Sequence, residues 1–157
     1  GEDLRMNCQS LKELVLQGVN VGTEQAANKL RTLIGMSSGL TSLTVTNAEF
    51  TSMSLATLFL QKPREMRIQF AKLEYLDLSY NNLDTQAARD FVNMALASER
   101  PMLRYLNLSN NPRIGDTGSR SVLDLLGAKH CKLEDVKIEG TGMELGTYQH
   151  IDIVVSV

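Results

Sequence analysis

Apolar residues recur along this chain as short triplets, with aliphatic side chains at the first, fourth and sixth positions of each. Two copies are nearly identical, LEYLDLSYNNL at 73–83 and LRYLNLSNN at 103–111. Weaker copies start at residues 11, 40 and 133, so the five starts are separated by 29, 33, 30 and 30 residues. A near-constant period of this length indicates stacked structural repeats. The leucines of the two clear copies, which we expect to be structural, are Leu73, Leu76, Leu78, Leu103, Leu106 and Leu108.

Each triplet predicts a short strand followed by a helix. The helical pattern is clearest in the units that start at residues 11, 73 and 103. Positions four and six of a triplet are two residues apart and therefore face the same side of a strand. Apolar residues then recur at helical spacing, and Leu96 is among those expected to face the core. The expected helices and their N-caps are 23–34 with Thr23, 84–97 with Asp84, and 116–126 with Asp116.

The second unit is the least regular of the five. A helix is expected around 53–59, and the extra residues that stretch this unit to 33 are interpreted as a surface insertion at 62–70. The basic residues Lys62, Arg64 and Arg67 are interrupted by an acidic one, so the segment reads as a solvated loop. A contact site on this loop is the alternative.

The phrase LxxLxLxxN resembles that of leucine-rich repeats. Units of about 30 residues with a full helix, and the stretch NPRIGDTGSRSVLDLL, resemble the ribonuclease-inhibitor-like subfamily. The resemblance implies an α/β fold, a right-handed solenoid of about five repeats, with a parallel sheet on the concave side and helices outside. It also implies an intracellular protein. Residues 11–145 are expected to form the repeats, 1–10 an N-terminal cap or truncated preceding repeat, and 146–157 a C-terminal cap or partial strand.

Position nine of the phrase is asparagine in the two clear units only. We expect Asn81 and Asn111 to turn their amides inward and to bond backbone groups that have left the sheet ladder. The other units carry Val19, Ala48 and Thr141 at this position. Their turns are therefore expected to be less regular.

The residues between the leucines predict a binding surface, because positions three, five and seven face away from the helices. Tyr75 and Tyr105 share position three in neighbouring strands, so their rings are expected to stack. Aromatic residues are enriched in binding hot spots, although such a pair can also serve only to stabilise the sheet. The candidate contact residues are Tyr75, Asp77, Tyr80, Tyr105, Asn107, Asp135, Lys137 and Glu139.

Composition narrows the function further. The 157 residues contain 16 Lys and Arg against 18 Asp and Glu, a formal charge of −2, which gives no electrostatic footprint for nucleic acid. No apolar run is long enough to span a bilayer. Cys8 and Cys131 are expected to be reduced, and the neighbouring His130 and Cys131 fit neither a zinc site nor an activated thiol. No cofactor, metal or catalytic residue is therefore expected.

These observations favour a non-enzymatic protein–protein interaction module that binds a protein or peptide with basic groups. Nucleic acid binding and membrane insertion are not expected, and the expected location is intracellular and cytoplasmic. The subfamily also includes actin regulators such as tropomodulin, so a cytoskeletal or flagellar scaffold is the alternative. A Ran-type GTPase-activating protein is a weaker one, because its loop arginine could only be Arg113 here and no motif of that family matches.

Overall fold

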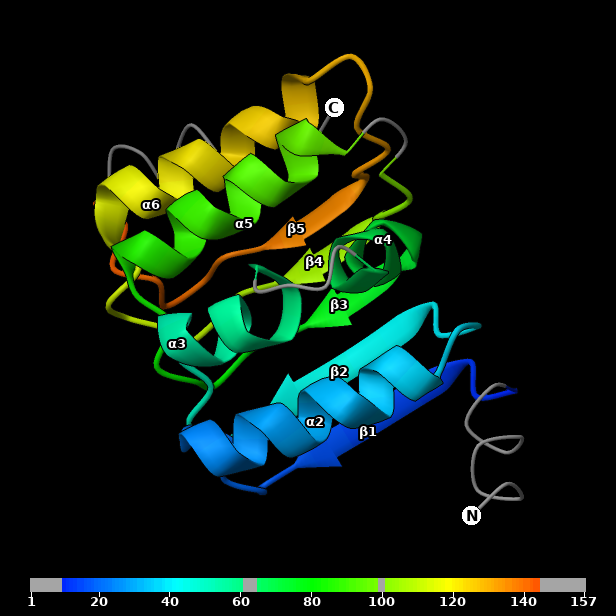
Figure 1. Cartoon of the computed structure of the whole chain (residues 1–157). Coiled ribbons are helices and arrows are strands. Elements are labelled where there is room, and N and C mark those ends of the chain that lie inside the picture. The colour runs from blue at the N-terminus through cyan, green and yellow to red at the C-terminus, as the bar shows by residue number, and fades with distance from the viewer. Residues whose placement is uncertain (1–9, 61–64, 99–100, 145–157) are drawn as a thin grey trace.

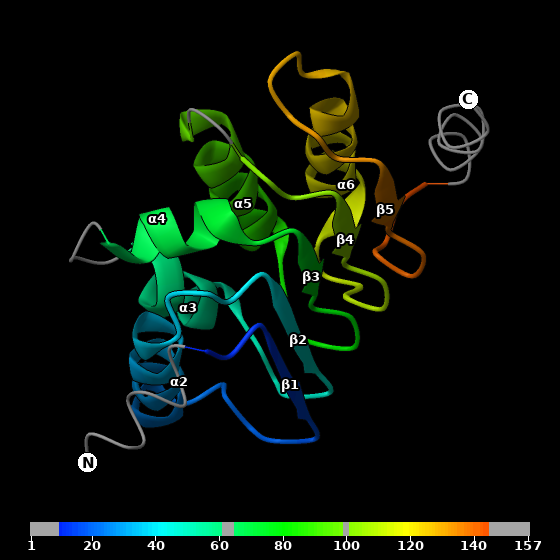
Figure 2. The same cartoon turned by 90° about the vertical axis from the view of Figure 1, so that its right-hand side faces the viewer.

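The chain folds into two layers, a sheet of five strands and a set of helices packed against one of its faces (Figures 1 and 2). The structure, a computed structural model, describes residues 10–60, 65–98 and 101–144, without the side chains of 65–67. Neighbouring strands are parallel and follow one another in chain order. The predicted α/β solenoid is therefore confirmed. The strands are β1 Glu13–Gln17, β2 Ser42–Thr46, β3 Tyr75–Asp77, β4 Tyr105–Asn107 and β5 Asp135–Lys137.

The described helices all lie on one side of the sheet, and none of them covers its other side (Figure 2). Five of the described helices are α-helical, and two further segments of other helix types continue two of them. A π-helix, Ala56–Leu60, follows α3, and a 3-10 helix, Asp124–Gly127, follows α6. The α-helices are α2 Glu24–Met36, α3 Ser52–Leu55, α4 Glu65–Lys72, α5 Thr85–Ala97 and α6 Gly115–Leu123.

Two of the three predicted N-caps are confirmed. Thr23 accepts the backbone N–H of Ala26, and Asp84 accepts that of Ala87. The prediction for Asp116 is wrong, because α6 begins one residue earlier, at Gly115. Asp116 lies in the first turn of the helix, where its carboxylate pairs with Arg120 at 3.1 Å. An acidic residue in that position stabilises the helix through its dipole rather than as a cap.

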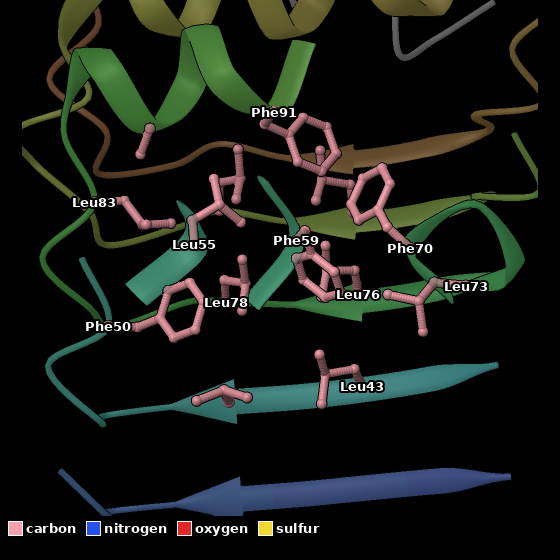
Figure 3. Packing of buried hydrophobic residues seen from close by; sticks show 14 of the residues in the cluster. Leu43, Phe50, Leu55, Phe59, Phe70, Leu73, Leu76, Leu78, Leu83 and Phe91 are labelled. Carbon is pink, nitrogen blue, oxygen red and sulfur yellow. The ribbon is translucent and has the colours of Figure 1, made fainter. Parts of the chain in front are cut away.

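The triplet leucines form the centre of the core. Leu73, Leu76, Leu78, Leu103, Leu106 and Leu108 are all buried, and Figure 3 shows several of them beneath the helices. The prediction for Leu96 is wrong, because this side chain is 48% exposed. Leu96 follows the buried Ala87 by nine residues, which at 3.6 residues per turn is half a turn around the helix. Met94 and Ala95 occupy the inward positions instead.

The prediction of a surface insertion at 62–70 is wrong for the end of this segment, residues 69 and 70. Gln69 and Phe70 lie in α4 and are buried. The ring of Phe70 packs edge-on against Phe59 at 5.2 Å and against Phe91 at 5.6 Å, so it joins three helical segments in one aromatic cluster (Figure 3). Gln69 donates from Nε2 to the carbonyl of Ser37 at 2.8 Å. Gln69 and Phe70 of the second unit therefore belong to the core, whereas Ile68 beside them is exposed.

Asn81 and Asn111 turn their side chains inward, as predicted, and both are buried. The Asn81 Nδ2 group donates to the carbonyls of Val45, Leu78 and Ser79, and its Oδ1 atom accepts the N–H groups of Ala48 and Phe50. Asn81 thus bonds backbone groups in the turn of the preceding unit. Position nine of that unit is Ala48, whose side chain cannot form hydrogen bonds. In the fifth unit, the buried Thr141 makes a smaller version of this contact, with its hydroxyl donating to Ile138.

The proposed end caps cannot be compared with the structure. Residues 1–9 and 146–157 lie outside the described residues, as do Lys62, Arg64 and the side chain of Arg67. Among the residues that are described, no helix is long and apolar enough to cross a membrane.

Candidate functional site

The open face of the sheet is built from two rows of side chains that run across all five strands. Strand register places Glu13, Ser42, Tyr75, Tyr105 and Asp135 side by side in the first row. The second row contains Val15, Thr44, Asp77, Asn107 and Lys137. We call these ten residues the open face. They lie between inward-facing aliphatic residues, because side chains alternate along a strand.

Tyr75 and Tyr105 stack at the centre of the open face. Their ring centroids are 4.3 Å apart and their planes differ by 3°, which confirms the predicted stack. Both side chains are half-buried. The centroid distance is a little shorter than the roughly 4.8 Å between neighbouring strands. The two rings therefore form one rigid aromatic surface at the middle of the sheet.

The pKa of Tyr75 is raised to about 12, mainly by burial and then by the charge of Tyr105 and a side-chain hydrogen bond with it. The nearby carboxylates Asp77 and Glu13 act in the same direction. Tyr75 is therefore neutral at physiological pH and can donate its hydroxyl proton. The Asn107 amide lies 3.4 Å from the Tyr105 hydroxyl, so the pair also has a polar contact in the second row.

Charge on the open face and its edge is mostly negative. Glu13, Asp77 and Asp135 lie on the open face itself, and the exposed Glu139 follows β5. Lys137 is the one basic side chain in either row. None of these five groups forms an ion pair within the described part of the chain. A partner that carries basic groups therefore finds carboxylates that are not already neutralised.

The expectation that position seven belongs to the open surface is wrong for the three inner strands. Thr46, Ser79 and Ser109 are buried. Asp77 accepts the N–H of Ser79 at 2.9 Å, and Asn107 accepts that of Ser109 at 3.0 Å. In the third and fourth units, a position-five side chain thus bonds the backbone of position seven at the start of the turn. The exposed surface is therefore two rows deep rather than three.

Tyr80 lies beyond this surface, on the loop after β3. Its side chain is 62% exposed, and it makes no ring contact with the Tyr75–Tyr105 pair in the described structure. Its φ of 58° is left-handed, and the residues at the same position of the other units, Gly18, Asn47, Asn110 and Gly140, share this conformation. Glycine and asparagine tolerate it readily, whereas tyrosine does not. The sequence shows glycine or asparagine at this position in four units, but it does not by itself show that the backbone there is left-handed.

The remaining candidates form no reactive cluster. His130 is exposed and Cys131 is partly buried, and burial raises the pKa of the Cys131 thiol, which disfavours the nucleophilic thiolate. Arg113 is exposed on the loop between β4 and α6. Within the described ranges, no three His, Cys, Asp or Glu side chains are grouped so that they could hold a metal ion.

Glu13 and Ser42 occupy position three of the surface predicted from the sequence, but they are not among its candidate contact residues. Both belong to weak copies of the repeat, so their spacing alone gives no reason to prefer them over other polar positions. The register joins them to the tyrosine pair in one row. In the sequence, the one sign that Glu13 and Ser42 lie beside the tyrosines is that all of these residues occupy position three of their units.

Comparisons with known proteins agree with this architecture. Models of the leucine-rich repeat match residues 72–94 and 101–122, the two units with the clearest phrase. The solved tropomodulin C-terminal domain of Caenorhabditis elegans aligns with 99% of this chain and 88% of its own, with a TM-score of 0.69 and 13% identity. The leiomodin-1 actin-binding site 2 aligns with 99% of this chain and 84% of its own, with a TM-score of 0.71 and 14% identity. No curated protein matches the sequence at a significant level.

At such identities the two solved structures establish the fold and nothing more. The repeat models match the leucine phrase in the third and fourth units. The phrase recurs about every 30 residues because each unit adds one strand to the parallel sheet in chain order. The strand, turn and helix that recur along the described chain are therefore those of leucine-rich repeats, which the family models place at residues 72–94 and 101–122.

Proposed function

We propose that the chain is a non-enzymatic interaction module that binds another protein on its open face. The observation that carries this proposal is the stacked Tyr75–Tyr105 pair at the centre of the open face of the sheet. A rigid aromatic surface loses little conformational entropy on binding, and aromatic residues dominate binding hot spots. The unpaired carboxylates around it favour a partner region with basic groups.

Actin is the second, more specific candidate as the partner. The leiomodin-1 structure with the same fold is named for its actin-binding site 2. Its alignment covers nearly all of this chain, and in this chain we expect the open face to form the contact with actin. On this proposal the protein is intracellular and associated with the cytoskeleton, and the ribonuclease-inhibitor-like repeat remains the expected subfamily.

A differential capture experiment tests the general proposal. The wild-type chain, Tyr75→Ala/Tyr105→Ala and Leu96→Ala are each immobilised and exposed to extract from source cells. Leu96 is a suitable control because it is exposed on α5, in the helical layer. We expect a partner that the wild type and Leu96→Ala retain and that the double variant loses. Equal retention by all three variants would move the contact to another surface.

Purified actin then tests the specific candidate. We expect the chain to bind actin monomers or to sediment with filaments, and the double variant to bind at least about 30-fold more weakly, which corresponds to about 2 kcal/mol. Failure of the wild type to bind either form removes actin as the partner. In a parallel assay with a panel of small GTPases, GTP hydrolysis is expected to stay at its basal rate. Stimulation that depends on Arg113 would instead support a GTPase-activating protein.

A further inference from the structure

Only one face of the Tyr75 ring is covered by its aromatic neighbour. Tyr105 stacks on the side of β4, and within the described structure no other ring contacts Tyr75. Because the two planes are nearly parallel, the other face of Tyr75 is directed toward β2. The residue paired with Tyr75 on that strand is Ser42, whose side chain is short. The free face of the ring therefore lies over a small residue.

Glu13 lies one strand beyond Ser42 in the same row. Two strand spacings, about 10 Å, separate the backbones of Tyr75 and Glu13. A flat group stacked on Tyr75 at about 3.5–4.0 Å would lie above Ser42, within reach of the Glu13 carboxylate. We call Glu13, Ser42, Tyr75 and Asp77 the Ser42 site.

The Ser42 site is electrostatically suited to a cation. Glu13 and Asp77 are the two charged residues among the open-face positions of β1, β2 and β3, and both are negative. Asp77 bonds the Ser79 N–H through Oδ1, which leaves its second oxygen without a hydrogen bond in the described structure. Both carboxylates also contribute to the raised pKa of Tyr75, consistent with their lying near its hydroxyl. An aromatic face with two carboxylates beside it attracts a positive charge.

The opposite side of the tyrosine pair differs. The outer face of Tyr105 is directed toward β5, where the paired residue is Asp135 itself. No small residue separates the ring from this carboxylate. A planar group would have to displace the Asp135 side chain before it could stack. Because Asp135 lies in the same row but directly beside Tyr105, a substitution of Asp135 provides a matched control for one of Glu13.

We infer that the Ser42 site binds an arginine side chain of the partner, an assignment that rests on the proposed function. The guanidinium group stacks on the free face of Tyr75 and donates N–H groups to Glu13 and Asp77. Arginine fits better than lysine because its cation is planar, stacks on aromatic rings and presents several donors in one plane. A lysine ammonium is not planar, so it cannot stack on the ring in this way, and it does not present several donors in one plane.

Three short peptides test the ligand chemistry directly, without the unknown partner. Acetyl-Gly-Arg-Gly-amide and its lysine and citrulline counterparts are titrated into isotope-labelled wild-type chain and followed by NMR. We expect the arginine peptide to shift the Tyr75 ring and Ser42 amide resonances saturably, with a dissociation constant on the order of millimolar. The citrulline peptide, which has the same shape without the charge, should bind at least about tenfold more weakly. Equal shifts from the arginine and citrulline peptides would overturn the assignment.

Variants of the chain test the location. Ser42→Leu covers the free ring face and should abolish the saturable shift, whereas Glu13→Gln should weaken binding about fivefold. Asp135→Asn removes the same formal charge on the other side of the pair and should change binding by less than about twofold. A thermal melt followed by circular dichroism checks that each variant is folded. An equal loss in Glu13→Gln and Asp135→Asn would indicate general charge attraction and contradict a defined site.

The same variants separate this inference from the proposed function. If Tyr75→Ala/Tyr105→Ala loses the protein partner while Ser42→Leu retains it, the interaction module stands and the arginine site is wrong. If both variants lose the partner by at least about tenfold, and the arginine peptide binds as expected, the site is supported. If neither variant changes partner binding, both the proposed function and the arginine site fail.

Discussion

Tyr75 and Tyr105 lie on neighbouring strands with their rings 4.3 Å apart and nearly parallel. This contact forms because both residues occupy position three of their units and β3 pairs with β4 in register. Burial, followed by the charge and hydrogen bond of Tyr105, makes the ionisation of Tyr75 unfavourable in the folded chain.

The pH dependence of stability should reveal this. The pKa of Tyr75 is raised from 10.0 to about 12 in the folded chain. The stability that depends on its neutral form is fully present below pH 10 and is lost as the pH rises through about 12. Urea unfolding at about pH 9 and about pH 11 should therefore show a smaller loss for Tyr75→Phe than for wild type. Identical losses in the two proteins would show that Tyr75 ionises as readily in the fold as in the unfolded chain.

Asn81 should be far more important for stability than its neighbour Asn82. Asn81→Ala leaves the buried N–H groups of Ala48 and Phe50 without their acceptor, which should cost about 2–4 kcal/mol. Asn82 is exposed, so Asn82→Ala should change the free energy of unfolding by no more than about 0.5 kcal/mol. Urea denaturation of the two variants measures the difference, and similar midpoints would contradict the role given to Asn81.

Two residues of α4 test whether this helix belongs to the core. Phe70→Ala removes a buried ring that contacts Phe59 and Phe91, and should cost about 3–5 kcal/mol. Ile68 is 49% exposed, so Ile68→Ala should cost less than about 1 kcal/mol. The comparison uses thermal or urea unfolding. If both substitutions have only a small effect on the free energy of unfolding, α4 does not contribute to the core and the segment is a surface insertion.

A glycine in α6 allows the close approach of α5. A Cβ atom at Gly118 would lie 2.9 Å from Ile114 Cγ2 and 3.1 Å from Ala88 Cβ, whereas one at Gly127 meets nothing within 4 Å. Gly118→Val should therefore lower the free energy of unfolding by about 1–3 kcal/mol through overpacking. Gly127→Val provides the control and should have a much smaller effect. Equal destabilisation would mean that backbone preference, rather than helix packing, decides the cost.

The sequence predicts the repeated part of this molecule well, because each leucine triplet specifies the same local geometry. Leu76 and Leu106 pair across β3 and β4, and the stack of the tyrosines follows from the same register. Asn81 and Asn111 are predictable for a related reason, since a buried amide must satisfy backbone groups.

Features outside the period are predicted less well. The polar and basic residues near 62–67 suggest solvent, yet Phe70 is buried by contacts with Phe59 and Phe91 from distant segments. The start of α6 depends on the left-handed backbone of Gly115, which moves Asp116 into the first turn. The Ser42 site likewise depends on which residues share a row across three strands, and one strand alone does not reveal it.

The central claim is that the open face, centred on the tyrosine pair, contacts the partner protein. Hydroxyl-radical footprinting with mass spectrometry measures side-chain protection in the unmodified wild-type complex. We predict that oxidation of Tyr75 and Tyr105 falls at least about threefold on binding, as expected for burial at the centre of an interface. Met53 and Leu96, which are exposed on α3 and α5, should be oxidised as in the free chain. Protection of Met53 and Leu96 with unchanged oxidation of the tyrosines would contradict the account.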